Sequence, residues 1–142
     1  EIDLTIFFNR NQLRYLYLGK NPYIKFKKNS TKIRLESIFT LDISSTSKKL
    51  ISSIDLNSSR KLINLDLSFN ELNMNDLNSI PFNNYPTLRN ININGIKIDY
   101  SRHLFSSIFN SIRYDVKMNF NSVSKIDLKD FIYNSLNLNR LD

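Results

Sequence analysis

The sequence predicts an α/β repeat fold with short parallel strands on one face and helices, 3₁₀ turns or irregular segments on the other. Two observations lead to this prediction. Residues 62–72 place apolar side chains around one asparagine in the pattern L-x-x-L-x-L-x-x-N-x-L. Related stretches recur every 24 to 26 residues along the 142-residue chain. A regular spacing of this kind is typical of proteins that stack repeats around one continuous core.

The stretch 62–72 explains how one repeat is organised. Leu65 and Leu67 alternate with polar Asn64 and Asp66, so a short strand here buries the leucines on one face. Asn70 follows at the turn. Because an amide side chain both donates and accepts, it can bind the backbone of its own turn and of the neighbouring one. We therefore expect turn asparagines to connect successive repeats.

The other copies fit the pattern less closely. Central apolar positions lie 25, 24, 26, 25 and 25 residues apart, at Leu16, Leu41, Leu65, Ile91, Val116 and Leu141. The asparagine position is occupied in order by Asn21, Thr46, Asn70, Ile96 and Asn121. The Thr46 hydroxyl can replace part of the amide's bonding, whereas Ile96 interrupts the ladder of turn side chains. Five regular spacings are stronger evidence than one motif match.

This pattern resembles the leucine-rich repeat. The resemblance implies a fragment of a curved, horseshoe-shaped solenoid, with the parallel strands on its concave face. We interpret residues 1–142 as one domain, with a possible N-terminal cap strand at 1–12 and five repeats at 13–137. Residues 138–142 then begin a truncated or capping repeat. Residues 1–8 could instead be the tail of a preceding repeat, because the chain starts at Glu1 and ends abruptly, as a piece excised from a longer protein would.

The segments between the strands differ in their patterns. Residues 99–112 and 124–136 carry apolar side chains at helical spacing. Residues 77–86 predict a shorter helix or a 3₁₀ turn, and residues 51–56 predict a largely extended segment.

Equivalent positions of parallel strands form columns across a sheet, because neighbouring strands lie about 4.8 Å apart. The first column contains Tyr15, Thr40, Asn64, Asn90 and Asp115. The second contains Tyr17, Asp42, Asp66, Asn92 and Lys117. The resemblance implies that such a concave face, with Lys20 beside it, binds another protein without reaction or cofactor. Tyr15 and Tyr17 are the expected aromatic anchors. Phe69 and Phe120 either extend the surface at one rim or pack within their turns.

Asp42 and Asp66 are expected to be neighbours in the second column, where two carboxylates repel each other unless a cation lies between them. A basic group of the partner would satisfy them, but a solvated pair neutralised by nearby lysines is an open alternative. We expect no metal site, because hard cations usually take more oxygen ligands than one such pair provides.

The formal net charge of +7 favours a second interpretation, an anion-binding module for nucleic acid or membrane phosphate. Basic residues concentrate in segment 10–34, and the candidate anion patch comprises Lys25, Lys27, Lys28, Lys32 and Arg34. An ordinary solvated loop explains the same residues. A purely architectural segment of a large assembly is a third hypothesis.

Other classes are disfavoured. The chain lacks cysteine and a recognisable signal peptide, which favours an intracellular protein, cytoplasmic or nuclear. His103 is the only histidine and has no nucleophile motif beside it, and neither glycine lies in a phosphate-binding loop. We therefore expect no enzymatic activity and no cofactor.

Overall fold

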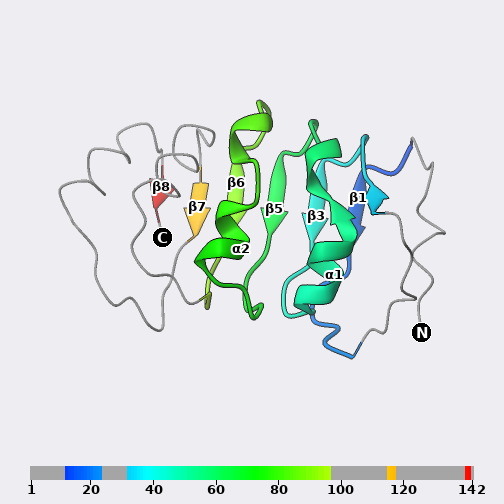
Figure 1. Ribbon diagram of the computed structural model, residues 1–142. Coiled ribbons are helices and arrows are strands. Elements are labelled where there is room, and N and C mark those ends of the chain that lie inside the picture. The colour runs from blue at the N-terminus through cyan, green and yellow to red at the C-terminus, as the bar shows by residue number, and fades with distance from the viewer. Residues whose placement is uncertain (1–11, 24–31, 97–114, 118–139, 142) are drawn as a thin grey trace.

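The computed structural model describes residues 12–23, 32–96, 115–117 and 140–141, and these form an α/β fold with a parallel sheet (Figure 1). The sheet is six-stranded in the order β1-β3-β5-β6-β7-β8. Its strands are β1 (Tyr15–Tyr17), β3 (Thr40–Asp42), β5 (Asn64–Asp66), β6 (Asn90–Asn92), β7 (Asp115–Lys117) and β8 (Arg140–Leu141). The predicted helices at 99–112 and 124–136 and nearly all of the predicted cap strand lie outside the described residues.

All strand pairs of this sheet are parallel, and their register follows the sequence spacing. Leu16 pairs with Leu41, and Leu65 pairs with both Leu41 and Ile91. The register continues through Val116 of β7 to Leu141 of β8. The prediction of parallel strands with the two columns of outward-facing positions in register is therefore confirmed.

The backbone ladder between strands extends into the turns that follow them. One residue in each turn after β1, β3, β5 and β6 adopts a left-handed backbone conformation, with φ of 60° at Lys20, 47° at Ser45, 54° at Phe69 and 67° at Gly95. In the first three, the N–H donates to a carbonyl oxygen of the next turn, at Ser44, Ser68 and Asn94, over 2.8–2.9 Å. The turns are thus hydrogen-bonded to one another like the strands.

Helix α1 (Lys48–Ser53) corrects the prediction of an extended segment at 51–56. The Ser47 hydroxyl accepts a hydrogen bond from the Leu50 N–H and so caps the helix, while Leu50 and Ile51 are buried. The isoleucines of this segment favour extended structure, but the cap and the burial of one helical face outweigh that preference. The chain becomes extended only at β4 (Ile54–Asp55), which η2 (Leu56–Ser58) follows.

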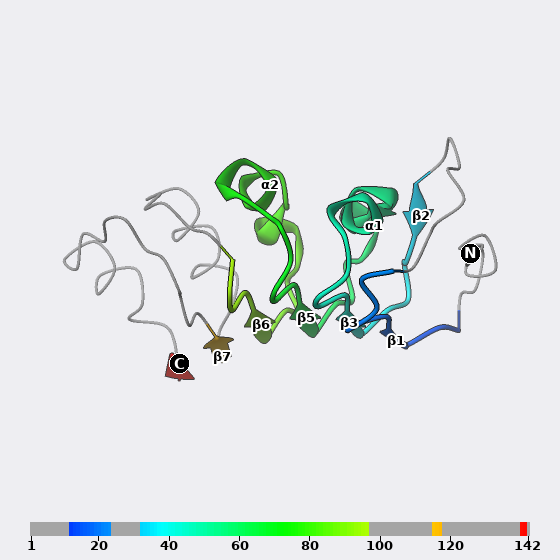
Figure 2. The same ribbon diagram turned by 90° about the horizontal axis from the view of Figure 1, so that it is seen from below.

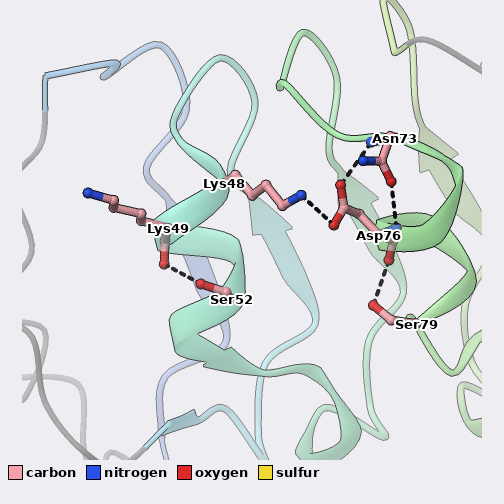
Figure 3. Close-up of polar contacts among 6 residues, drawn as sticks. All are labelled: Lys48, Lys49, Ser52, Asn73, Asp76 and Ser79. Carbon is pink, nitrogen blue, oxygen red and sulfur yellow. Dashed lines mark hydrogen bonds and ion pairs between the residues drawn. The ribbon is translucent and has the colours of Figure 1, made fainter.

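The 3₁₀ turn predicted within 77–86 is confirmed by η3 (Phe82–Asn84), while the short helix α2 (Met74–Asn78) begins three residues earlier than that range. A capping box starts α2. The Asn73 side chain accepts from the Asp76 N–H, and the Asp76 carboxylate accepts from the Asn73 N–H (Figure 3). The other Asp76 oxygen lies 2.8 Å from Lys48 Nζ of α1, so an ion pair joins the two helices.

A second, two-stranded parallel sheet joins β2 (Ile33–Arg34) to β4. The sequence did not predict it, because two residues are too few to show an alternating pattern. Ile33 and Ile54 are buried on one side of this sheet. It connects the segment between β1 and β3 to the segment between β3 and β5.

The core lies between the large sheet and the layer that contains α1 and α2 (Figure 2). The central strand residues Leu41, Leu65 and Ile91 are at most 2% exposed. Tyr85 is fully buried and donates its hydroxyl to the Leu56 carbonyl oxygen over 3.0 Å. Burial, assisted by the negative charge of Asp55, raises the pKa of Tyr85. The hydroxyl therefore stays protonated and keeps this hydrogen bond.

Among the described residues, no helix is both long and apolar enough to span a bilayer.

Candidate functional site

The face of the large sheet turned away from α1 and α2 is the candidate site, and we call it the open sheet face (Figure 2). Its side chains are those that flank the buried central residue of each strand. On β1, Leu16 is buried, whereas Tyr15 and Tyr17 are 57% and 63% exposed. The same alternation repeats on β3, β5 and β6 with half-buried polar residues. Alternation therefore places one polar and aromatic set of side chains on a single surface.

A depression of about 330 Å³ lies on this face. Most of its lining comes from the two predicted columns, and the rest comes from three central strand residues. The lining residues are Tyr17, Thr40, Leu41, Asp42, Asn64, Leu65, Asp66, Asn90, Ile91, Asn92 and Lys117. The structure thus brings eight of the eleven predicted partner-binding residues together in one hollow.

Of the other three predicted residues, two are not part of the lining and one has a side chain that the structure does not describe. Tyr15 is exposed on β1 beside the depression rather than in its lining. Lys20 lies in the left-handed turn after β1, away from the lining. Asp115 occupies its predicted register in β7 opposite Asn90, but its side chain lies outside what the structure describes.

Side chains of the first column form a hydrogen-bonded ladder. The Asn64 amide donates to the Thr40 hydroxyl over 2.9 Å, and the Asn90 amide donates to the Asn64 oxygen over 2.5 Å. Each donor belongs to the strand that follows its acceptor in the sheet. These asparagines therefore hold their neighbours in fixed positions, a role that the alternating pattern alone did not reveal.

In the second column, the two aspartates are tied to their own strands. One oxygen of Asp42 accepts from the N–H and hydroxyl of Ser44, at 2.9 and 2.7 Å. Asp66 binds Ser68 in the same way, at 2.9 and 2.6 Å. Sequence reasoning missed this role, although the repeated Asp-x-Ser spacing of D-I-S and D-L-S was a usable signal.

The second oxygens of the two aspartates differ. In Asp66 this oxygen accepts from the Asn92 amide over 2.9 Å. Asp42 would receive the equivalent bond from position 66, but a carboxylate there has no proton to donate. The ladder of the second column is therefore interrupted between β3 and β5.

Within the described ranges, neither Asp42 nor Asp66 forms an ion pair. The ion pairs found there join Arg34 to Glu36 and Lys48 to Asp76, both away from the lining of the depression. The alternative that nearby lysines neutralise the aspartates has no support in these contacts.

An aromatic group adjoins the depression at β1. The Tyr15 ring meets the Phe39 ring edge-on, with centroids 6.5 Å apart and planes at 84°. The Arg14 guanidinium carbon lies 5.2 Å from the Phe39 centroid. These contacts hold Tyr15 beside Tyr17 in a defined position.

The turn asparagine Asn70 forms the bonds expected of it. Its amide donates to the carbonyl oxygens of Leu67 in its own turn and Ile43 in the preceding one, both over 2.8 Å. Its oxygen accepts from the Thr46 N–H over 2.9 Å. The Thr46 hydroxyl donates to Ile43, replacing part of the amide's bonding as predicted.

At the other described positions of the ladder of turn side chains, Asn21 and Ile96, the side chain does not join two turns by a hydrogen bond. Asn21 is exposed and donates to Leu18 and Gly19 of its own turn. Ile96 is 1% exposed and packs in the core. Asn121 lies outside the described residues. Asn70 is therefore the buried amide that joins two turns in the described part of the chain.

Phe69 extends from the turn after β5 and is 61% exposed. Its ring also lies against Gly95, where an added Cβ would come within 2.5 Å of Phe69 Cδ1. Gly95 therefore leaves room for the ring. Both interpretations of Phe69, rim exposure and packing on a turn, describe part of its environment. Phe120 lies outside the described residues.

The candidate anion patch is only partly described. Lys25, Lys27 and Lys28 lie in the undescribed range 24–31. Lys32 is exposed, and Arg34 pairs with Glu36 over 3.0 Å, which offsets its charge. Metal-ligating clusters of three or more histidine or acidic residues do not occur in the described ranges.

Comparisons of this chain with family models, with curated proteins and with solved structures find no match.

Proposed function

We propose that the chain is a leucine-rich-repeat solenoid whose open sheet face binds another protein. The observation that supports this best is the shared register of the polar and aromatic positions over five strands, around a depression of about 330 Å³. Hydrogen bonds fix the polar side chains of β3, β5 and β6 before a partner arrives. Such preorganisation reduces the ordering cost of binding.

Binding without catalysis agrees with the chemistry of the face. Asp42 and Asp66 are its carboxylates among the described side chains, and each uses one oxygen to fix its own strand. A shallow, solvent-open hollow excludes water poorly, whereas acid–base chemistry is helped by water exclusion. We therefore propose a binding surface with no cofactor.

A three-bait affinity capture tests this proposal. The baits are the wild-type chain, a Tyr17→Ala/Asp66→Lys double variant and a variant with Lys25, Lys27, Lys28 and Lys32 neutralised. We expect a defined protein to be retained by the wild-type and lysine-neutralised baits and lost from the double variant. Unchanged unfolding midpoints would show that the loss is not caused by unfolding.

The opposite pattern would contradict the proposal. Capture that depends on the lysines, falls steeply with salt and disappears after nuclease treatment would identify an anion-binding module, because phosphate contacts weaken as ionic strength rises.

A further inference from the structure

The interruption of the second column indicates what the partner brings to the open sheet face. Asp42 and Asp66 are register partners on adjacent strands, so their carboxylates lie about one strand spacing apart. Asp66 receives the Asn92 amide, whereas the second oxygen of Asp42 receives no donor from the described residues. Two like charges at this distance oppose each other until a cation joins them.

The position next to Asp42 in the same column is aromatic. Tyr17 of β1 is the register partner of Asp42, is 63% exposed and lines the same depression. Tyr17, Asp42 and Asp66 therefore present an exposed aromatic ring followed by two carboxylates on consecutive strands. A positively charged group attracts both kinds of surface.

Among the described residues that line the depression, the basic one lies at the opposite end from Tyr17. Lys117 lines the depression from β7, two strand steps beyond Asp66. Two strand steps are on the order of 10 Å, so Lys117 does not neutralise the two aspartates. A partner can therefore supply the positive charge that they lack. Among the described lining residues, the negative charges thus lie on β3 and β5 and the positive charge lies on Lys117 of β7.

We propose that the protein partner inserts an arginine side chain between Tyr17, Asp42 and Asp66. This inference rests on the proposed binding function of the open sheet face and specifies the chemistry of its partner. Arginine fits better than lysine because its planar guanidinium stacks on a tyrosine ring and presents N–H donors along more than one edge. The same group can therefore contact the ring and bridge both carboxylates.

Peptides selected against the intact chain test this inference. A library of random 12-residue peptides displayed on phage is selected on the immobilised chain, and the recovered peptides are synthesised with a fluorescent label. Binding is measured by anisotropy to the wild type, to Asp42→Asn/Asp66→Asn and to Glu71→Gln. Glu71→Gln is the charge control, because Glu71 is exposed in a turn outside the depression. Each peptide is also made with arginine replaced by citrulline, which keeps the shape and loses the charge.

We expect the selected peptides to contain arginine and to bind at least tenfold more weakly when it becomes citrulline. The same loss is expected for Asp42→Asn/Asp66→Asn, with no change for Glu71→Gln. Asn64→Tyr, which fills the depression without adding charge, should abolish binding if it unfolds near the wild-type midpoint.

Two other outcomes separate the inference from the proposed function. In the first, peptide binding is abolished by Asn64→Tyr but is unchanged by citrulline in the peptide and by Asp42→Asn/Asp66→Asn. This result would overturn the arginine site and leave the proposed binding face intact. Peptides that are indifferent to Asn64→Tyr as well would overturn both proposals.

Discussion

At the scale of single residues, the buried amide of Asn70 has the most contacts to lose. It is 6% exposed and its side chain connects its own turn to Ile43 and Thr46 of the preceding one. Removing it takes this partner from the Leu67 carbonyl oxygen and the Thr46 N–H, and it leaves the Ile43 carbonyl oxygen with the Thr46 hydroxyl alone among these side chains. Buried polar groups that lose their partners destabilise a fold more than the lost bond alone.

Asn70→Ala is therefore expected to lower the free energy of unfolding by roughly 1–3 kcal/mol. Urea denaturation followed by circular dichroism measures it. Asn21→Ala is the matched control, because Asn21 is exposed and donates only within its own turn among the described residues. Equal losses for the two variants would show that the connection between turns contributes nothing.

For Asp66, in contrast to Asn70, we expect a substitution that does not lower stability. Asp66→Asn removes the repulsion from Asp42 and provides an amide that can donate to it, as Asn64 donates to Thr40 in the first column. The amide oxygen introduced at position 66 can still accept from Ser68, and the new bond to Asp42 offsets the bond from the Asn92 amide, which needs the carboxylate oxygen that the substitution removes. We expect the thermal unfolding midpoint to stay unchanged or to rise. A fall comparable to that of Asn70→Ala would mean that the carboxylate itself stabilises the fold.

Sequence patterns predicted the residue positions better than their contacts. The columns from Tyr15 and Tyr17 onward follow from strand alternation, so their register was predictable. The Asp-to-Ser bonds and the asparagine ladder were not, because they depend on side-chain rotamers and on the neighbouring strand. Lys20 lies in a left-handed turn, so strand alternation does not determine its position.

At the scale of elements, two very short helices are stabilised by capping and by contacts to each other. Helices of five and six residues are unstable alone, so α2 and α1 depend on Asn73 and Ser47 at their starts and on the core beneath them. The ion pair of Lys48 with Asp76 adds a direct connection between them (Figure 3).

The charge of Asp76 makes this connection sensitive to pH. Partial burial opposes ionisation, but the hydrogen bonds from Lys48 and from the Asn73 backbone, with the Lys48 charge, hold the pKa of Asp76 below its usual value. A carboxyl with a lowered pKa in the folded state stabilises the fold above its unfolded pKa of about 4. That stabilisation is lost as the pH falls through the folded pKa.

Lys48→Met is expected to lower stability by about 0.5 kcal/mol at neutral pH, because the Lys48 side chain is half exposed and solvent screens the pair. The difference from wild type should shrink as the pH falls below about 4. Lys49→Met is the control on the same helix. Its backbone carbonyl accepts from Ser52, and its side chain is exposed (Figure 3). A pH-independent loss in Lys48→Met would point to lost packing instead.

Element types were predictable where the pattern and the cap agreed. The segment containing Leu77 and Phe82 showed short apolar spacing, and its helix and 3₁₀ turn formed as expected behind the Asn73 cap. The segment around Ile51 did not form the expected extended structure. Isoleucine favours strands, but Ser47 caps a helix at this point. Two-residue strands such as β2 are below what periodicity can detect.

At the scale of the whole molecule, one core extends along β1, β3, β5 and β6. A single buried cluster contains the central strand residues Leu16, Leu41, Leu65 and Ile91 together with residues of the segments between the strands. No strand of three residues buries enough surface by itself, so each depends on its neighbours. The spacing of 24 to 26 residues was enough to predict this arrangement from sequence.

Leu65→Ala is expected to destabilise the chain by about 2–5 kcal/mol, because Leu65 is 2% exposed at the middle of the sheet. Because the core is continuous, the loss should affect the whole unit rather than one strand. Unfolding curves from circular dichroism and from an environment-sensitive label at position 17 should therefore shift together. Separate midpoints for the two probes would indicate independent units.

We propose that a protein partner contacts the open sheet face. The most direct test of this proposal places a photo-cross-linking amino acid at position 17 on that face or at position 52 on α1, where Ser52 is exposed on the helix side. After irradiation in lysate, we expect one defined adduct from position 17, lost in the presence of Asn64→Tyr, and none of the same mass from position 52. An adduct that forms from position 52 and not from position 17 would contradict the claim.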